Sequence, residues 1–143
     1  MSGEWNHKVF AVDAGSFEQT ALDIFRFQAV QNVVYRSYLE ALHIDPSSIH
    51  FLAQIPYLPI RFFRSGGVKT TLFEPAAIFE SSGTTGSNSS RHFIKDLSLY
   101  ETSLLRCFEL FYGPVKYWCI IGLLPSYLER SNSSLVYMVQ WLV

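Results

Sequence analysis

Ten consecutive small polar residues, Ser81 to Ser90, interrupt a chain that is otherwise 49% hydrophobic. Such a stretch has no apolar side chains to bury, and its glycines, serines and asparagine favour turns and loops. It follows directly on residues 76–80, which have the composition of a short strand. The segment therefore predicts a polar loop at the end of a strand, in a chain with enough apolar material for a folded core.

Beyond this loop the pattern predicts a helix and then a second strand. The helix is expected to begin near Ser98 and to end at Gly113-Pro114, which are helix-stop residues. The run from Tyr117 to Leu124 is continuously apolar, which is typical of a strand covered on both faces in a parallel sheet. The order strand, loop, helix, strand predicts a βαβ unit and hence an α/β fold.

The amino-terminal part is predicted to be helical. Apolar residues recur at three- and four-residue steps from Phe17 to Leu42, which predicts one long amphipathic helix. Residues 55–64 are apolar but contain two prolines, so we expect an extended segment packed on the core. We expect a single domain with a helical segment, 1–45, and an α/β part, 46–143. A last helix, beginning near Ser133, is apolar on nearly every side, so we expect the chain to be a fragment of a larger domain.

Charge, hydropathy and motif spacing exclude several classes of protein. The formal net charge of −1 gives no electrostatic support for a nucleic-acid partner. No apolar run reaches the roughly 20 residues that span a bilayer, and no basic stretch leads into an apolar one at the start, so we expect a cytoplasmic protein. The spacings of a serine-hydrolase elbow, H-E-x-x-H and C-x-x-C are all missing. Cys107 and Cys119 lie in apolar patterns and are predicted to be buried, reduced thiols.

The polar loop has the chemistry of a phosphate-binding loop. Glycines let successive backbone N–H groups turn toward one anion, and Ser and Thr hydroxyls add donors, so the loop can surround a phosphate without a charge of its own. Neither the P-loop pattern G-x-x-x-x-G-K-[ST] nor the Rossmann pattern G-x-G-x-x-G is present. The same composition also fits a flexible Ser/Gly linker, and this alternative stays open.

Six residues of the loop, Ser81-Ser82-Gly83-Thr84-Thr85-Gly86, match the signature [ST]-[SG]-G-[ST]-[ST]-G. With the flanking stretches 58–63, 90–92, 123–130 and 134–138, they resemble the acyl-protein synthetase (LuxE-type) branch of the adenylate-forming, acyl-CoA synthetase-like superfamily. The resemblance covers about the last two thirds of the chain. It implies the amino-terminal part of a large adenylating domain. The parent enzyme would use ATP and Mg²⁺ to convert a fatty or other carboxylic acid into an acyl-adenylate. It would then pass the acyl group to a thiol of a protein cysteine, a carrier protein or coenzyme A.

The resemblance also implies roles for individual residues. It assigns phosphate binding to Ser81, Ser82, Gly83, Thr84, Thr85, Gly86, Ser87 and Arg91, places Thr85 near Mg²⁺, and makes Pro125 and Tyr127 the gate of the acyl pocket. The catalytic residues are left unassigned. The superfamily's Pro and Lys after the loop are missing, so Arg91 is the residue that would supply the positive charge. His92 is either a phosphate contact or a solvated loop residue.

Two further expectations concern activity and partners. The carboxylate that helps to hold Mg²⁺ in the superfamily, and the lysine of its small C-terminal domain, belong to motifs beyond Val143, so we expect the chain to be inactive alone. Cys107 and Cys119 are expected to be poor acyl acceptors because of their burial. The alternative from a different class is a non-catalytic interaction module whose last helix docks on a partner. Self-association is expected, because an incomplete sheet edge and an apolar last helix leave surface to be covered.

Overall fold

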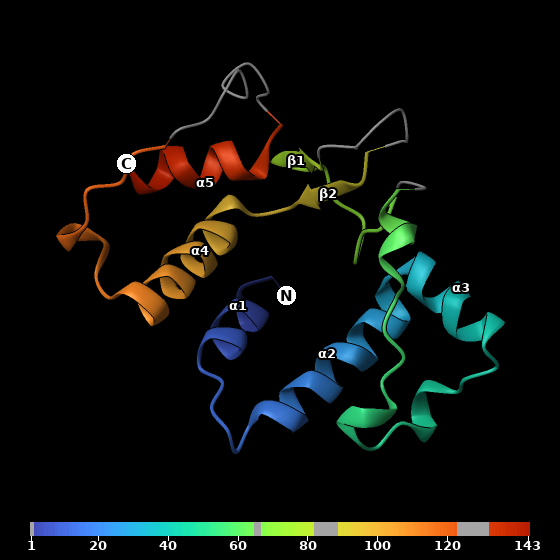
Figure 1. Ribbon diagram of the computed structural model, residues 1–143. Helices are drawn as coiled ribbons and strands as arrows, with labels where there is room; N and C mark the ends of the chain where they lie inside the picture. The colour runs from blue at the N-terminus through green and yellow to red at the C-terminus, as the bar shows by residue number, and fades with distance from the viewer. Residues whose placement is uncertain (1, 65–66, 82–88, 123–131) are drawn as a thin grey trace. The chain divides into compact units, whose positions relative to one another are not determined.

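The computed structural model describes residues 2–64, 67–81, 89–122 and 132–143. Within these residues the fold is mixed α/β, with five α-helices, short 3₁₀ turns and one two-stranded sheet (Figure 1). Contacts divide the chain into two compact units, one made of Met1–Phe62 and Gly67–Leu72 and the other of Phe63–Gly66 and Phe73–Val143. The coarse prediction of an α/β fold is confirmed.

The first unit is helical. It contains α1 (Ser2–Phe10), α2 (Phe17–Gln31) and α3 (Val33–Ala41), followed by the 3₁₀ turns Pro46–Ser48 and Leu52–Gln54. A third 3₁₀ turn, Ile60–Phe63, lies where the first unit gives way to the second. The second unit contains β1 (Ala77–Glu80), β2 (Arg91–Ile94), α4 (Leu97–Tyr112), the 3₁₀ turn Val115–Tyr117 and α5 (Ser134–Leu142).

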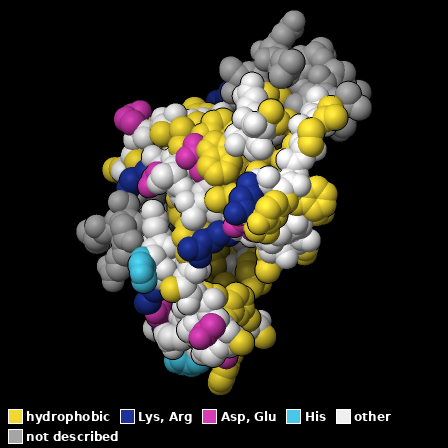
Figure 2. Space-filling view, turned by 90° about the vertical axis from the view of Figure 1, so that its left-hand side faces the viewer, with side chains coloured by type: hydrophobic (Ala, Val, Ile, Leu, Met, Phe, Trp, Pro, Cys, Tyr) yellow, Lys and Arg dark blue, Asp and Glu magenta, His cyan; other side chains and the backbone are white. Residues whose placement is uncertain are grey.

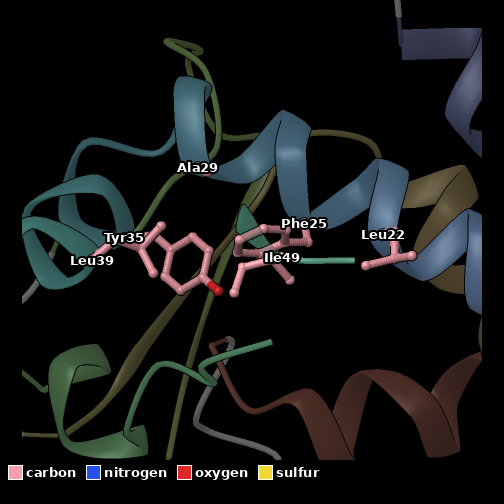
Figure 3. Packing of buried hydrophobic residues seen from close by; sticks show 6 residues of the cluster. All are labelled: Leu22, Phe25, Ala29, Tyr35, Leu39 and Ile49. Atoms are coloured by element: carbon pink, nitrogen blue, oxygen red, sulfur yellow. The ribbon is translucent and has the colours of Figure 1, made fainter. Parts of the chain in front are cut away.

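The core of the first unit lies between α2 and α3. Figure 3 shows its buried side chains, which are Leu22, Phe25, Ala29, Tyr35, Leu39 and Ile49. Residues 55–59 run without regular structure across this core, with Ile55 and Leu58 packed against the cluster. The extended segment predicted over 55–64 is therefore confirmed only in its first half, because Ile60–Phe63 form a 3₁₀ turn. The hydroxyl of Tyr35 donates to the backbone carbonyl of Pro56 at 2.6 Å, so the phenol is satisfied although its ring is buried.

The prediction of one helix from Phe17 to Leu42 is wrong, because the helix breaks at Asn32. This residue has extended φ and ψ angles, and its side-chain oxygen accepts from the backbone N–H of Tyr35 at 3.1 Å, which makes it the N-cap of α3. Its side-chain amide donates to the Thr70 hydroxyl at 3.2 Å, and the N–H of Thr71 donates to the carbonyl of Gln31 at 3.0 Å. Apolar spacing runs through the break, because both helices present their apolar faces to the same core.

The prediction of a parallel βαβ unit is also wrong for the residues that the structure describes. Strands β1 and β2 pair antiparallel, with Ala77 opposite Ile94 and Glu80 opposite Arg91. The polar loop therefore joins the two strands of a hairpin, and β2 stands between the loop and α4. Residues 91–94 were not expected to form a strand, because they follow the polar run directly and alternate too briefly to show a period.

The apolar run that was expected to form the second strand does not do so over its described part. Tyr117 ends a 3₁₀ turn and residues 118–122 have no regular structure. Tyr117 and Ile121 are 75% and 78% exposed. A strand needs a neighbour to satisfy its backbone, and the described residues offer this run none. The indole N–H of Trp118 instead donates to the carbonyl of Tyr112 at 2.8 Å, which holds the run against the end of α4.

Two helix boundaries in the second unit agree with the sequence signals. Helix α4 ends at Gly113, whose φ of 75° lies in the region that glycine adopts at little cost. Helix α5 begins at Ser134, and the Ser133 hydroxyl accepts from the N–H of Val136. Each helix in the described part of the chain falls short of the length and apolarity that crossing a bilayer requires.

Candidate functional site

Hydrogen bonds between Ser81 and Ser90 hold the two ends of the polar loop together, and we call this pair of residues the neck. The backbone N–H of Ser81 donates to the carbonyl of Ser90 at 3.1 Å, and the N–H of Ser90 donates to the hydroxyl oxygen of Ser81 at 3.1 Å. The two hydroxyls are also hydrogen-bonded, with 2.9 Å between their oxygens. Ser90 is only 9% exposed. The two serines therefore fix the distance between the ends of the loop.

The carboxylate of Glu80, the residue before Ser81, accepts hydrogen bonds from two side chains. Arg91 Nε donates to one oxygen of Glu80 at 3.1 Å, and the side-chain amide of Asn132 donates to the other at 2.7 Å. The backbone N–H of Glu80 donates to the carbonyl of Asn132 at 2.8 Å. Glu80 thus ties both strands of the hairpin to the turn that precedes α5.

The hairpin rests on an aromatic group from three elements. Phe79 on β1 is 4% exposed, and its ring lies 5.0 Å from that of Tyr100 on α4 and 5.3 Å from that of Tyr137 on α5. The hydroxyl of Tyr137 donates a short hydrogen bond to the carboxylate of Glu101 on α4. This bond favours the neutral phenol and raises the pKa of Tyr137, while burial raises the pKa of Tyr100. The group fixes the neck relative to both helices of its own unit.

The structure brings together only part of the predicted phosphate site. Ser81 and Arg91 lie at the neck, whereas Ser82, Gly83, Thr84, Thr85, Gly86 and Ser87 lie outside the described residues, as do Pro125 and Tyr127 of the predicted acyl gate. The guanidinium of Arg91 is paired with Glu80 and its side chain is 59% exposed.

His92 belongs to strand β2 and not to the loop. Its exposed ring stacks on that of Phe63, with 5.0 Å between the ring centroids. The described contact of this residue is therefore with an aromatic ring of its own unit.

The described residues fit the predicted Mg²⁺ only poorly. No cluster of three or more His, Cys, Asp or Glu side chains among them is arranged to hold a metal ion. Glu80 is the carboxylate nearest in sequence to the loop, and each of its oxygens already accepts a hydrogen bond.

The prediction that both cysteines are buried is wrong. Cys107 on α4 and Cys119, in the irregular run after it, are both exposed free thiols. The residues around both cysteines are apolar, but the described part of the second unit buries few of them, and several large hydrophobic side chains near Cys107 and Cys119 face solvent. Burial therefore gives no reason to exclude either thiol as an acyl acceptor.

Sequence reasoning missed Glu80, Ser90 and Asn132, which organise the neck. A signal for the serine pair was present, because Ser81 and Ser90 bound the polar run symmetrically. No local signal pointed to Asn132, which lies 52 residues from Glu80 and meets it only through the fold.

A comparison of this chain with models of known protein families found no match. Searches of curated proteins and of solved structures likewise found no protein that matches it. Any functional conclusion therefore depends on the residues and their geometry.

Proposed function

We propose that this chain is the phosphate-binding part of an ATP-dependent acyl-activating enzyme, acting in the cytoplasm. In this proposal the segment from Ser81 to Ser87 binds the phosphates of ATP within the amino-terminal portion of an adenylating domain. A fatty or other carboxylic acid is joined to the nucleotide as an acyl-adenylate, pyrophosphate leaves, and the acyl group passes to a thiol.

The closed neck of the loop is the observation that carries this proposal. A flexible linker needs no fixed distance between its ends, whereas here three hydrogen bonds between Ser81 and Ser90 hold the ends together. Bringing together the ends of a loop of this length lowers the conformational entropy of the chain. In the folded chain the neck already holds the ends together, so binding of a ligand does not have to do so. Backbone N–H groups and hydroxyls between closed ends can converge on one anion, which is the arrangement that phosphate binding requires.

Arg91 is the residue that we expect to supply positive charge to this site. Its pair with Glu80 is partly exposed, with 59% of the Arg91 side chain and 30% of the Glu80 side chain accessible, and exposed pairs contribute only about 0–1 kcal/mol. A polyphosphate carries more charge than one carboxylate and offers the guanidinium two oxygens at once. Exchange of Arg91 from Glu80 to a phosphate therefore costs little, and Asn132 continues to bind Glu80 afterwards.

In this proposal the thiol that accepts the acyl group can belong to any of three kinds of molecule. A protein cysteine, a carrier protein and coenzyme A each present a thiol that can attack the acyl carbonyl, forming a thioester and releasing AMP. Cys107 and Cys119 meet the requirement of access, since both are exposed.

Titration of Mg-ATP into the isotope-labelled chain, followed by NMR, tests the proposal. The amides of Ser81, Ser90 and Arg91 report on the neck, and we expect saturable shifts confined to this region. Replacing Thr84 and Thr85 by valine keeps the side-chain shape but removes two hydroxyls. Each hydrogen bond to a charged oxygen contributes about 1.5–3 kcal/mol, so each substitution should weaken binding at least about tenfold.

The control is Ser103→Ala, which removes an exposed hydroxyl from α4 away from the loop. It should leave the affinity unchanged. A folded chain whose neck amides do not respond to Mg-ATP would refute the phosphate-binding role. Equal weakening by Ser103→Ala would show that the threonine variants act through stability and not through the loop.

A second candidate function, protein interaction, is favoured by one specific observation. Several large hydrophobic side chains at the end of α4 and after it are exposed, although they belong to a folded unit. Such groups mark interaction surfaces more often than isolated exposed residues do.

A further inference from the structure

A group of six exposed hydrophobic residues occupies the last turn of α4 and the run that follows it. Their exposed fractions range from 52% to 79%. We call this group the aromatic surface, and it consists of Leu110, Phe111, Tyr112, Tyr117, Trp118 and Ile121. Figure 2 shows one face of the molecule, on which hydrophobic side chains reach the surface with charged side chains among them.

The centre of the aromatic surface is held in place by its own contacts. The rings of Tyr112 and Trp118 lie 6.0 Å apart at a near-perpendicular angle, and Phe108 lies 5.0 Å from the first and 6.5 Å from the second. The hydrogen bond from the Trp118 indole to the Tyr112 carbonyl fixes the irregular run to the helix. A partner that binds here meets rings that are already ordered, so little side-chain entropy is lost on association.

The extent of the aromatic surface matches one half of a protein–protein interface. If each of the four aromatic side chains offers about 200 Å² in full, their exposed fractions amount to roughly 500 Å², and the exposed Leu110 and Ile121 bring the total toward about 800 Å². A standard interface covers about 800 Å² on each partner, whereas the largest apolar patch of a typical monomer covers about 300–600 Å². The exposed area is therefore large enough for a stable complex with a partner that wraps the end of the helix, because Leu110, Phe111 and Tyr112 are consecutive in α4 and point about 100° apart.

The charges beside this surface favour a second copy of the chain as its partner. Glu109 precedes Leu110, and Lys116 precedes Tyr117; both side chains are exposed and they carry opposite charges. In a two-fold symmetric contact the same surface meets itself, so Glu109 of each copy can face Lys116 of the other. A net charge of −1 adds little long-range repulsion between copies. An anionic lipid surface would be repelled by Glu109 and attracted by Lys116, so this pair of charges gives it no advantage.

We propose that the aromatic surface is the interface of a two-fold symmetric homodimer. This location differs from the expected one. The sequence predicted self-association through an incomplete sheet edge and an apolar last helix. On α5, Val136 is 4% exposed and Tyr137 is bonded to Glu101 inside the unit, whereas Leu135 and Trp141 remain 53% and 39% exposed. The proposal is independent of ATP binding, and the two are tested by different measurements.

Sedimentation velocity of the full chain over a wide range of concentration tests the dimer. We expect a reversible monomer–dimer equilibrium that Phe111→Asp weakens at least about 25-fold, because an unpaired charge buried in an interface costs as much as the loss of a hot-spot residue. Leu72→Asp is the matched control, since Leu72 is a 94% exposed hydrophobic residue of the first unit. It should leave the equilibrium unchanged.

Exchange of the charges of Glu109 and Lys116 gives a test that leaves the residues of the aromatic surface unchanged. Glu109→Lys should weaken the dimer, and the double variant Glu109→Lys with Lys116→Glu should restore it. A chain that stays monomeric at every concentration would overturn the proposal, and so would a monomer that co-sediments with anionic vesicles. A dimer that responds equally to Leu72→Asp and Phe111→Asp would also overturn it.

Discussion

Truncation of Phe79 to alanine is expected to destabilise the second unit severely. The ring is 4% exposed and lies between the rings of Tyr100 and Tyr137, so its removal leaves a cavity where β1, α4 and α5 meet. The other buried residues described in this unit are Val136 and Ser90. Few apolar side chains are therefore placed to collapse into the space.

The expected cost follows from the size of the ring and of the unit. Phe→Ala substitutions in cores cost about 3–5 kcal/mol, which includes about 0.5–1.5 kcal/mol for each aromatic contact. The unit contains about 75 residues, for which an ordinary stability of about 0.05–0.15 kcal/mol per residue gives roughly 4–11 kcal/mol. Loss of Phe79 thus removes at least about a quarter of the stability of this unit, and all of it if the unit lies at the low end of that range.

Native-state hydrogen exchange measures this loss in the second unit alone. The amides to follow are those of Ala76 and Ser81, which donate across the hairpin to Ile94 and Ser90. Ile78→Ala is the control, because Ile78 lies on the same strand but is 38% exposed, and it should cost only about 1 kcal/mol. Equal protection of these amides in the Phe79→Ala and Ile78→Ala variants would refute the view that the aromatic group holds the hairpin.

Two further predictions concern the first unit. Thr71 has a φ of 71°, where a β-branched residue is strained by about 1–2 kcal/mol, so Thr71→Gly should raise the urea midpoint slightly. Thr70→Gly is the control and should lower the midpoint, because it removes the hydroxyl that accepts a hydrogen bond from Asn32. Burial raises the pKa of Tyr35 to about 12, above the ordinary value of 10.0, so this phenol stabilises the folded state below pH 10 and loses that effect as the pH rises toward 12. Tyr35→Phe should cost about 1 kcal/mol at neutral pH and make stability less sensitive to pH above 10; an unchanged alkaline profile in urea titrations would contradict this.

Helix ends in the second unit were predictable because their signals are local. Gly113 ends α4 by adopting a positive φ, and Ser133 caps α5 with its own hydroxyl. Both effects depend on residues within one turn of the helix end, so the sequence alone contains the relevant information.

The break at Asn32 and the run after Tyr117 were not predictable in the same way. Asn32 caps α3 and also binds Thr70, 38 residues away, and this second contact is invisible to any local pattern. Periodicity identifies which residues are apolar, but not whether the chain provides a surface to cover them. For residues 118–122 the described structure provides no neighbouring strand, so an apolar run becomes an exposed one.

The hairpin changes how the polar loop can bind a phosphate. In the predicted βαβ unit the loop would lead into a helix, whose N-terminus would add a partial positive charge to the site. In the structure residues 91–96 separate the loop from the first residue of α4, and the four residues of β2 among them alone span about 13 Å. Because a helix dipole acts only within about one turn, α4 adds little at that distance. Any affinity for phosphate must then come from the N–H groups and hydroxyls of the loop and from Arg91. Replacing Arg91 by alanine should accordingly flatten the salt dependence of Mg-ATP binding, whereas substitutions at the N-terminus of α4 should not.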